Sequence, residues 1–200
     1  MNHHPRRLVR TGFRRPIAST LMACGLSLAL LAGNAKAAME DENLLQPLPS
    51  GFKIANQQHN SRGALTEMVP STESVDNWTQ MVTTQIYFGS QGLSFDAYQS
   101  SMEERWKAAC DIAESAPITS GKENGYDFRI WMQSCHFNDK KRPPEITWFK
   151  MIQGNDSSYV VQVAFHAELE KSQVIQWMKY LKEVTVCDSR LRERACPVTN

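Results

Sequence analysis

The pattern of hydrophobic and polar positions gives five segments of the chain the character of β-strands, through alternation or through β-branched and aromatic residues. These segments are 51–57, 64–69, 126–136, 145–152 and 158–167. The turn-forming sequence HNSRG separates the first two, and QGND lies between the last two. We therefore expect two β-hairpins, with a further strand between them.

Three other segments carry apolar residues at helical spacing. The first, STESVDNWTQMV, follows Pro70, and the next residues, TTQIYF, fit either a strand or a continuation of that helix. The second, 95–113, follows Ser94 as a capping residue, and the third, 173–184, is expected to begin at Ser172. The apolar positions are Val75, Trp78, Met81 and Val82; Phe95, Tyr98, Met102, Trp106, Ala109 and Cys110; and Val174, Ile175, Trp177, Met178 and Leu181.

These elements predict an α+β fold, in which an antiparallel sheet is packed by two to three helices. We expect the folded domain over residues 51–186. The polar, proline-containing residues 38–50 precede it as an extended lead-in, and residues 187–200 follow as an irregular C-terminal tail.

The first 37 residues have the composition of a secretory signal peptide. An arginine-rich region without acidic residues precedes the apolar run 21–32, and Ala35-Lys36-Ala37 supplies the small residues of a cleavage site. The run is shorter than the roughly 20 residues that a membrane-spanning helix needs. We therefore expect export with cleavage after Ala37, and the long basic leader favours the periplasm of a Gram-negative bacterium.

Two other types of leader fit the sequence less well. The sequence LMAC, which ends at Cys24, resembles a lipobox and would make Cys24 a lipid-modified N-terminus, but the apolar run continues beyond it. The pair Arg14-Arg15 matches a twin-arginine signal poorly, because Phe13 precedes it and Pro16 follows it.

Charge is distributed unevenly between the leader and the rest of the chain. The whole sequence holds 22 basic and 21 acidic residues, a formal net charge of +1. The leader contains six of the basic residues and none of the acidic ones, so the mature chain has a net charge of −5. A mildly acidic protein is not expected to bind nucleic acid. We also expect no transmembrane span in the mature chain.

Four cysteines follow the leader: Cys110, Cys135, Cys187 and Cys196. An even number in an oxidising compartment indicates two disulfides, and four cysteines allow three pairings. Proximity along the chain favours Cys110–Cys135 and Cys187–Cys196. A metal or redox site is disfavoured, because the sequence has no CxxC motif and no zinc-ribbon spacing.

No motif of a serine hydrolase, zinc metalloprotease or phosphate-binding loop occurs in the sequence. We expect no catalytic residue, metal or cofactor. The histidines and carboxylates that could act in a zinc site or an acid–base pair are scattered. They are His59, His136 and His166, and Glu67, Asp76, Glu103, Glu104 and Glu145.

Two cationic clusters are candidate partner-binding sites. One is the charged loop 139–144, with Lys140, Lys141 and Arg142. The other is the C-terminal tail, with Arg190, Arg192 and Arg194. The three arginines of the tail alternate, so an extended segment would place all of them on one side.

The five tryptophans are expected in the core, with two possible exceptions. Trp131 and Trp148 would be able to stack against sugars if their strands exposed them on an open face of the sheet.

The order of these elements resembles that of bacterial exported proteins whose α/β sandwich is like that of PsbP, the extrinsic subunit of photosystem II. The residues that carry the resemblance are Phe52 in LPSGFKI, the segment 69–78 with Met81, the hairpin FKMIQGNDSSYVVQVAF and the apolar stripe 174–181. The resemblance covers most of 45–186. It implies a small non-catalytic binding or accessory subunit, and it carries over no functional residue.

The sequence as a whole predicts a non-catalytic periplasmic binding or accessory protein, with a protein partner in the cell envelope. The alternative is an inhibitor or immunity-type protein, whose cationic tail or loop would enter the acidic cleft of a secreted or periplasmic enzyme. A hydrolase that uses carboxylates or a metal is a third hypothesis.

Overall fold

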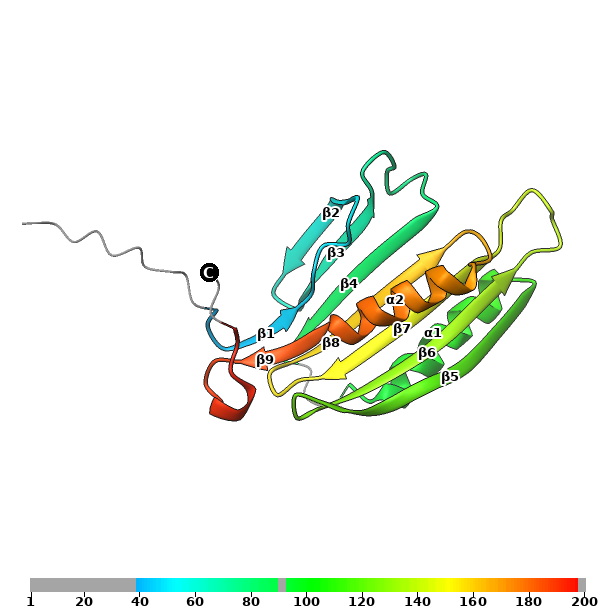
Figure 1. Cartoon of the computed structure of the whole chain (residues 1–200). Coiled ribbons are helices and arrows are strands. Elements are labelled where there is room, and N and C mark those ends of the chain that lie inside the picture. Colours follow the sequence, from blue (N-terminus) through cyan, green and yellow to red (C-terminus); the bar gives the residue numbers. More distant parts are fainter. Residues whose placement is uncertain (1–38, 90–92, 198–200) are drawn as a thin grey trace, which may run out of the picture. The chain divides into compact units, whose positions relative to one another are not determined.

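The structure, a computed structural model, describes residues 39–89 and 93–197. The predicted signal peptide, its cleavage after Ala37 and the proposed lipid attachment at Cys24 lie outside the described residues. The described part is an antiparallel sheet with two helices, which confirms the α+β class (Figure 1).

Seven strands form the main sheet in the order β2-β3-β4-β8-β7-β6-β5. Their bounds are β2 Phe52–Asn60, β3 Gly63–Pro70, β4 Gln80–Phe88, β5 Ile112–Glu123, β6 Tyr126–His136, β7 Glu145–Gln153 and β8 Ser157–Phe165. Both expected hairpins are confirmed, as β2–β3 and β7–β8, and so is the strand over 126–136. The pairing of β4 with β8 joins the two halves of the sheet.

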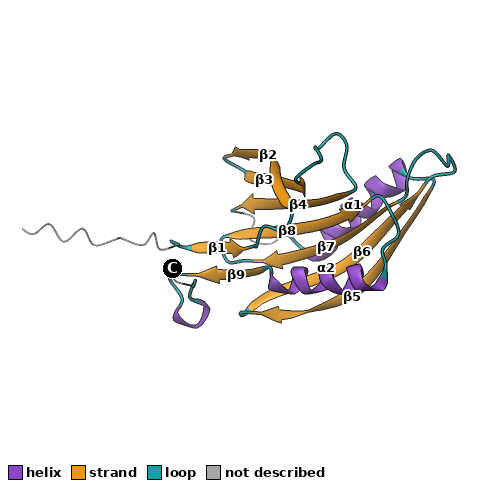
Figure 2. Cartoon of the chain, turned by 45° about the horizontal axis from the view of Figure 1, so that its top comes forward, coloured by secondary structure: helices purple, strands orange, loops and turns teal. Residues whose placement is uncertain are grey.

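The two helices, α1 (Phe95–Ala109) and α2 (Lys171–Glu183), lie on opposite faces of this sheet (Figure 2). Ser94 caps α1 as expected, because its side-chain oxygen accepts a hydrogen bond from the Ala97 N–H at 3.0 Å. The expected start of α2 at Ser172 is wrong. The helix begins after Glu170, which forms a capping box with Gln173.

The helix expected after Pro70 is wrong. Residues 71–79 form turns and bends, and Met81 and Val82 belong to β4. These two neighbours point to opposite faces, and both are buried, with Val82 in the core beneath α2. A strand that is buried on both faces has consecutive apolar residues, and these resemble one turn of a helix.

The second helix also ends earlier than expected. It stops at Ala109, and residues from Ile112 onward form β5, a strand that the sequence pattern does not reveal. The strand lies at the edge of the sheet and most of its residues are exposed. An exposed edge strand needs no alternation of apolar residues, so it leaves little hydrophobic signal.

The lead-in and the tail pair with each other. Strand β1 (Glu42–Leu45) runs antiparallel to β9 (Thr185–Asp188), so the extended lead-in includes a strand, and the start of the tail, which was expected to be irregular, is also part of a strand. The Glu42 carboxylate fixes this ribbon to the β7–β8 turn. It accepts hydrogen bonds from the backbone N–H groups of Asn155 at 2.5 Å and Asp156 at 3.1 Å, and from the Tyr159 hydroxyl at 3.1 Å.

Each face of the sheet has its own hydrophobic core. The core beneath α2 includes Phe165 and Trp177, whose ring centroids are 5.6 Å apart. The core beneath α1 is built on Trp131 and Phe149, which stack with centroids 4.9 Å apart. Two filled faces make the sheet the middle layer of three.

Both favoured disulfides are confirmed. Cys110–Cys135 joins the C-cap of α1 to β6, and Cys187–Cys196 joins β9 to the residues that follow the short 3₁₀ helix Arg192–Arg194. No helix among the described residues is long and apolar enough to cross a membrane.

Candidate functional site

Helix α1 packs against β5 and β6 and reaches Phe149 and Met151 on β7. On β4 its Tyr98 meets Gln85 and Tyr87, and the face of β3 and β4 beside this contact is open. Two adjoining cavities lie there, of about 240 Å³ over β2–β3–β4 and about 590 Å³ between β3–β4 and α1. Both cavities are lined by Leu65, Gln85 and Tyr87. We refer to the two together as the polar groove.

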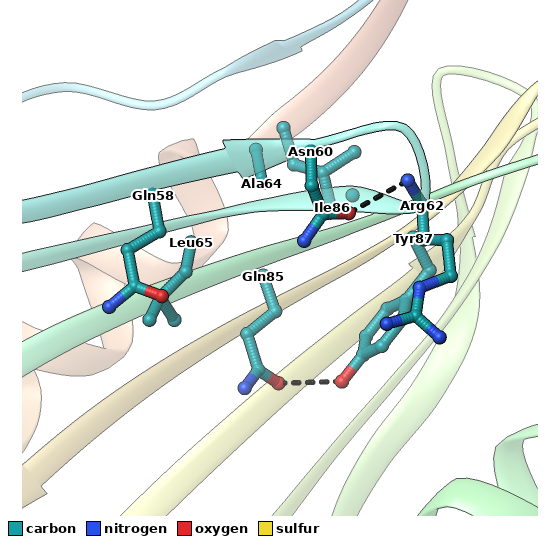
Figure 3. Close-up of a pocket in the computed structure, with 9 residues that line it drawn as sticks. Gln58, Asn60, Arg62, Ala64, Leu65, Gln85, Ile86 and Tyr87 are labelled. Atoms are coloured by element: carbon teal, nitrogen blue, oxygen red, sulfur yellow. Dashed lines mark hydrogen bonds between the residues drawn. The ribbon is translucent and has the colours of Figure 1, made fainter.

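Three neighbouring strands supply the floor of the polar groove. Figure 3 shows the side chains of Gln58 on β2, Leu65 on β3, and Gln85 and Tyr87 on β4 on the same side of the sheet. Gly63 is the cross-strand neighbour of Tyr87, and a side chain there would collide with the backbone carbonyl of Ile86, so the close approach of β3 and β4 requires glycine.

The wall of the groove comes from α1. Its lining residues include Ala97, Ser101 and Arg105, which recur every four residues and therefore share one face of the helix. Ala97 and Ser101 are small, so they leave room between the helix and the floor.

Hydrogen bonds between side chains hold the floor in place. The Gln85 Oε1 atom accepts from the hydroxyls of Tyr87 at 3.0 Å and Tyr98 at 2.9 Å, and more weakly from Gln162 Nε2 at 3.4 Å. Because the carbonyl oxygen of Gln85 is occupied in this way, its Nε2 group is left as the donor. That group donates to none of the described residues.

The tyrosines of the groove are neutral at physiological pH, as tyrosine ordinarily is, and burial strengthens this preference. Tyr98 is 7% exposed, and burial raises its pKa well above the ordinary value for tyrosine. Burial also raises the pKa of Tyr87, and its hydrogen bond with Tyr98 and the charge of Arg105 only partly oppose the effect. Both hydroxyls therefore act as fixed hydrogen-bond donors at neutral pH.

The groove also holds three charged side chains. Arg62, at the β2–β3 turn, and Arg105, on α1, are both exposed. Neither guanidinium makes an ion pair or hydrogen bond with another described residue. The carboxylate of Glu67 accepts a hydrogen bond from Asn56 Nδ2 at 2.7 Å.

The cationic tail does not have the arrangement expected from its sequence. The expectation of an extended segment with three arginines on one side is wrong, because residues 189–194 form a turn and the 3₁₀ helix. Arg190 donates to Asp188 and Asp156, both at 2.7 Å, and Arg194 lies over the Tyr126 ring at 4.6 Å from its centroid. Arg190 thus has a structural role, and Arg192 is exposed.

The cationic loop is exposed as expected. It connects β6 to β7, with Lys140, Lys141 and Arg142 at its tip, and it projects from the end of the sheet (Figure 1). Asp139 accepts a hydrogen bond from the Lys141 N–H at 2.9 Å, and the Arg142 guanidinium lies 3.4 Å from the Phe137 ring centroid.

Of the residues considered for chemistry, the structure brings His166 and Glu145 together, and the three histidines lie on separate segments of the chain. His166 lies 3.7 Å from Glu145 and stacks on Trp78, whereas His59 is on β2 and His136 ends β6. Within 39–89 and 93–197, no group of three or more histidine, cysteine, aspartate or glutamate residues could hold a metal ion.

The predicted burial of Trp131 and Trp148 in the core is confirmed. Trp131 is fully buried beneath α1 and Trp148 is 5% exposed beneath α2. The alternative in which these two rings stack against sugars is therefore wrong, since neither lies on an open face of the sheet.

Sequence reasoning missed the polar groove. Gln85 and Tyr87 lie in TTQIYF, the segment that fitted a strand or a helix equally well. Alternation was the available signal: Thr83, Gln85 and Tyr87 are partly exposed on one face, whereas Val82 and Thr84 are buried on the other.

No model of a known protein family matches the chain, and a search of curated proteins finds no match either.

Proposed function

We propose that the mature chain is a non-catalytic binding or accessory protein of the bacterial cell envelope, and that it binds a partner in the polar groove. The observation that carries this proposal is the fixed orientation of Gln85. Two tyrosine hydroxyls hold its carbonyl oxygen, and its Nε2 donors have no described acceptor. A donor that is already oriented loses little conformational entropy on binding.

The chemistry of the lining favours binding over proton transfer. A general acid or base works best when its pKa lies near the operating pH. The amides of Gln58, Gln85 and Gln162 do not titrate, and burial raises the pKa values of Tyr87 and Tyr98 away from neutrality. These groups suit the recognition of a ligand through hydrogen bonds.

Export to the periplasm is part of the proposal. Its support is the signal-peptide pattern of residues 1–37 and the two disulfides of the described domain, since disulfides persist in oxidising compartments. The PsbP-like sandwich is likewise proposed. An antiparallel sheet with one helix on each face is consistent with it.

A steric block of the groove tests the proposal. Ala97 lines the groove and is exposed, so Ala97→Trp would fill the space between α1 and β4 without changing any charge. Ala108→Trp is the matched control, because Ala108 is an exposed residue of α1 that lines neither cavity of the groove. Equal thermal midpoints would show that both variants fold.

Residues 38–200, immobilised through a tag, would be exposed to an envelope extract. We expect the wild type to retain at least one envelope protein that Ala97→Trp does not retain. Ala108→Trp should retain the same proteins as the wild type. Identical sets from all three proteins would contradict the proposal.

An inhibitor or immunity-type protein is the second candidate. The observation in its favour is the projecting loop with Lys140, Lys141 and Arg142, whose shape and charge suit an acidic cleft. Arg190 no longer supports this candidate, because Asp156 and Asp188 bind it within the fold.

A further inference from the structure

The arginines of this fold divide into two groups according to their partners. Arg129 pairs with Asp96 at 2.6 Å, and Arg190 pairs with Asp156 and Asp188 at 2.7 Å. Arg62, Arg105, Arg142, Arg192 and Arg194 have no such carboxylate among the described residues, and of these five Arg62 and Arg105 line the polar groove. A guanidinium with its five donors unoccupied is suited to bidentate recognition of a carboxylate.

The two arginines lie at different places in the groove. Gly63 pairs with Tyr87 in the β3–β4 register, so the turn that carries Arg62 lies at the Tyr87 end of the groove. Arg105 lies on α1, seven residues or about 10 Å along the helix axis beyond Tyr98, whose hydroxyl donates to Gln85 in the floor. A ligand that reaches both guanidinium groups therefore extends along the groove.

Between the arginines, the groove presents groups that match a peptide backbone. Gln58, Gln85 and Gln162 carry primary amides, which are chemically similar to a peptide group. The free Nε2 donors of Gln85 lie in the floor, where a backbone carbonyl of a bound segment would accept from them.

We propose that the polar groove binds an extended acidic segment of a partner protein, with two carboxylates of the segment held by Arg62 and Arg105. This inference rests on the proposed function and specifies its ligand. The charge of the groove is opposite to that of the mature chain, which is −5. Glu67 is the acidic residue of the lining, and Asn56 engages its carboxylate.

Labelled probes test the class of ligand by fluorescence anisotropy on the mature protein. The probes are the hexapeptide Ser-Glu-Ser-Glu-Ser-Glu, its Ser-Lys counterpart, and a galacturonate oligosaccharide as the anionic glycan. We expect the glutamate peptide to bind and the other two to bind at least about tenfold more weakly, with binding of the glutamate peptide falling as salt rises.

Two double variants carry the same change of charge. In Arg62→Gln/Arg105→Gln both changes lie in the groove, and we expect the affinity for the glutamate peptide to fall about tenfold or more. In the control, Arg142→Gln/Arg192→Gln, both lie outside the groove, and we expect a change within about twofold.

The inference is overturned if the two double variants bind the glutamate peptide equally, or if the galacturonate probe binds and the peptide does not. This failure is distinct from a failure of the proposed function. If Ala97→Trp loses a retained protein but the glutamate peptide does not bind, the groove is a binding site and its acidic ligand is wrong. If Ala97→Trp retains the same proteins as the wild type, the proposed function itself fails.

Discussion

Lys150 carries an ammonium group on a side chain that has no exposed surface. The group donates to the carbonyl oxygens of Leu181 and Val184, both at 2.8 Å, and to the carboxylate of Glu123. Burial lowers the pKa of Lys150, and the interaction with Glu123 opposes that change. The lysine therefore satisfies the carbonyl groups at the C-terminal end of α2, which otherwise lack partners.

Replacing this lysine should destabilise the fold. Lys150→Met keeps most of the volume but leaves two buried carbonyls without donors, so we expect the free energy of unfolding to fall by about 3 kcal/mol. Lys122→Met, on the exposed strand β5, is the control and should change it by less than about 0.5 kcal/mol. Urea unfolding measures both, and equal losses would contradict the structural role of Lys150.

Asp188 is 1% exposed, and hydrogen bonds from Arg190 hold the pKa of its carboxyl below the ordinary value for aspartate. The folded state therefore binds the proton less tightly than the unfolded state. This interaction stabilises the protein fully above the ordinary aspartate pKa of about 3.9, and the stabilisation is lost as pH falls through the lower folded value.

The pH dependence of unfolding tests this linkage. We expect the urea midpoint of the wild type to fall between about pH 5 and pH 2, and Asp188→Asn to show a smaller fall over the same range. The variant should already be less stable at neutral pH, because Arg190 loses a charged partner. Parallel pH profiles for the two proteins would show that Asp188 contributes nothing to acid sensitivity.

At the scale of elements, the predictability of the fold depends on how each strand is covered. Strand β6 and the β7–β8 hairpin were predicted because their runs of strand-forming residues are bounded by turn residues. Near its start, strand β4 contains Met81 and Val82, and the burial of both residues on opposite faces resembles helical spacing. Strand β5 gave no pattern, because an edge strand is specified by its pairing with β6 and not by burial.

The two disulfides differ in the loops that they close. Cys110 and Cys135 are separated by 25 residues, and Cys187 and Cys196 by 9. In the chain-entropy model, removing the first by double alanine substitution should lower the free energy of unfolding by about 3.5 kcal/mol, and removing the second by about 2.7 kcal/mol. Urea unfolding of the two double variants measures the difference.

A larger loss from the Cys187–Cys196 pair would contradict that ranking. Mass spectrometry of reduced and oxidised protein gives an independent check, since two disulfides correspond to the loss of four hydrogens. Free thiols at all four positions in protein recovered from the periplasm would reopen the hypothesis of a metal site.

At the scale of the whole molecule, the polar groove depends on contacts that no local pattern contains. Gln85 and Gln162 are neighbours because β4 pairs with β8, and Tyr98 reaches Gln85 because α1 packs back onto the sheet that precedes it. Glutamine and tyrosine have no period that marks them as a site. The sequence therefore predicts an α+β fold and, as a hypothesis, a binding protein, but the binding surfaces that it suggests are the two cationic clusters and not the polar groove.

Contacts between distant segments also explain why the predicted arrangement of the cationic tail is wrong. Arg190 alternates with Arg192 and Arg194 in the sequence, but its carboxylate partners come from β9 and from the β7–β8 turn. Long-range pairing thus determines which charges remain available to a partner. The charged side chains of Arg62, Arg105 and the 139–144 loop remain available to a partner.

Photo-crosslinking in cells tests the central claim, that the polar groove is the surface that binds a partner. A benzophenone amino acid would replace Gln58, which is exposed in the groove, and separately Lys141 in the projecting loop and Arg192 in the tail. We predict a discrete crosslinked product from position 58, abolished by Ala97→Trp. Products from position 141 or 192 without one from position 58 would contradict the claim.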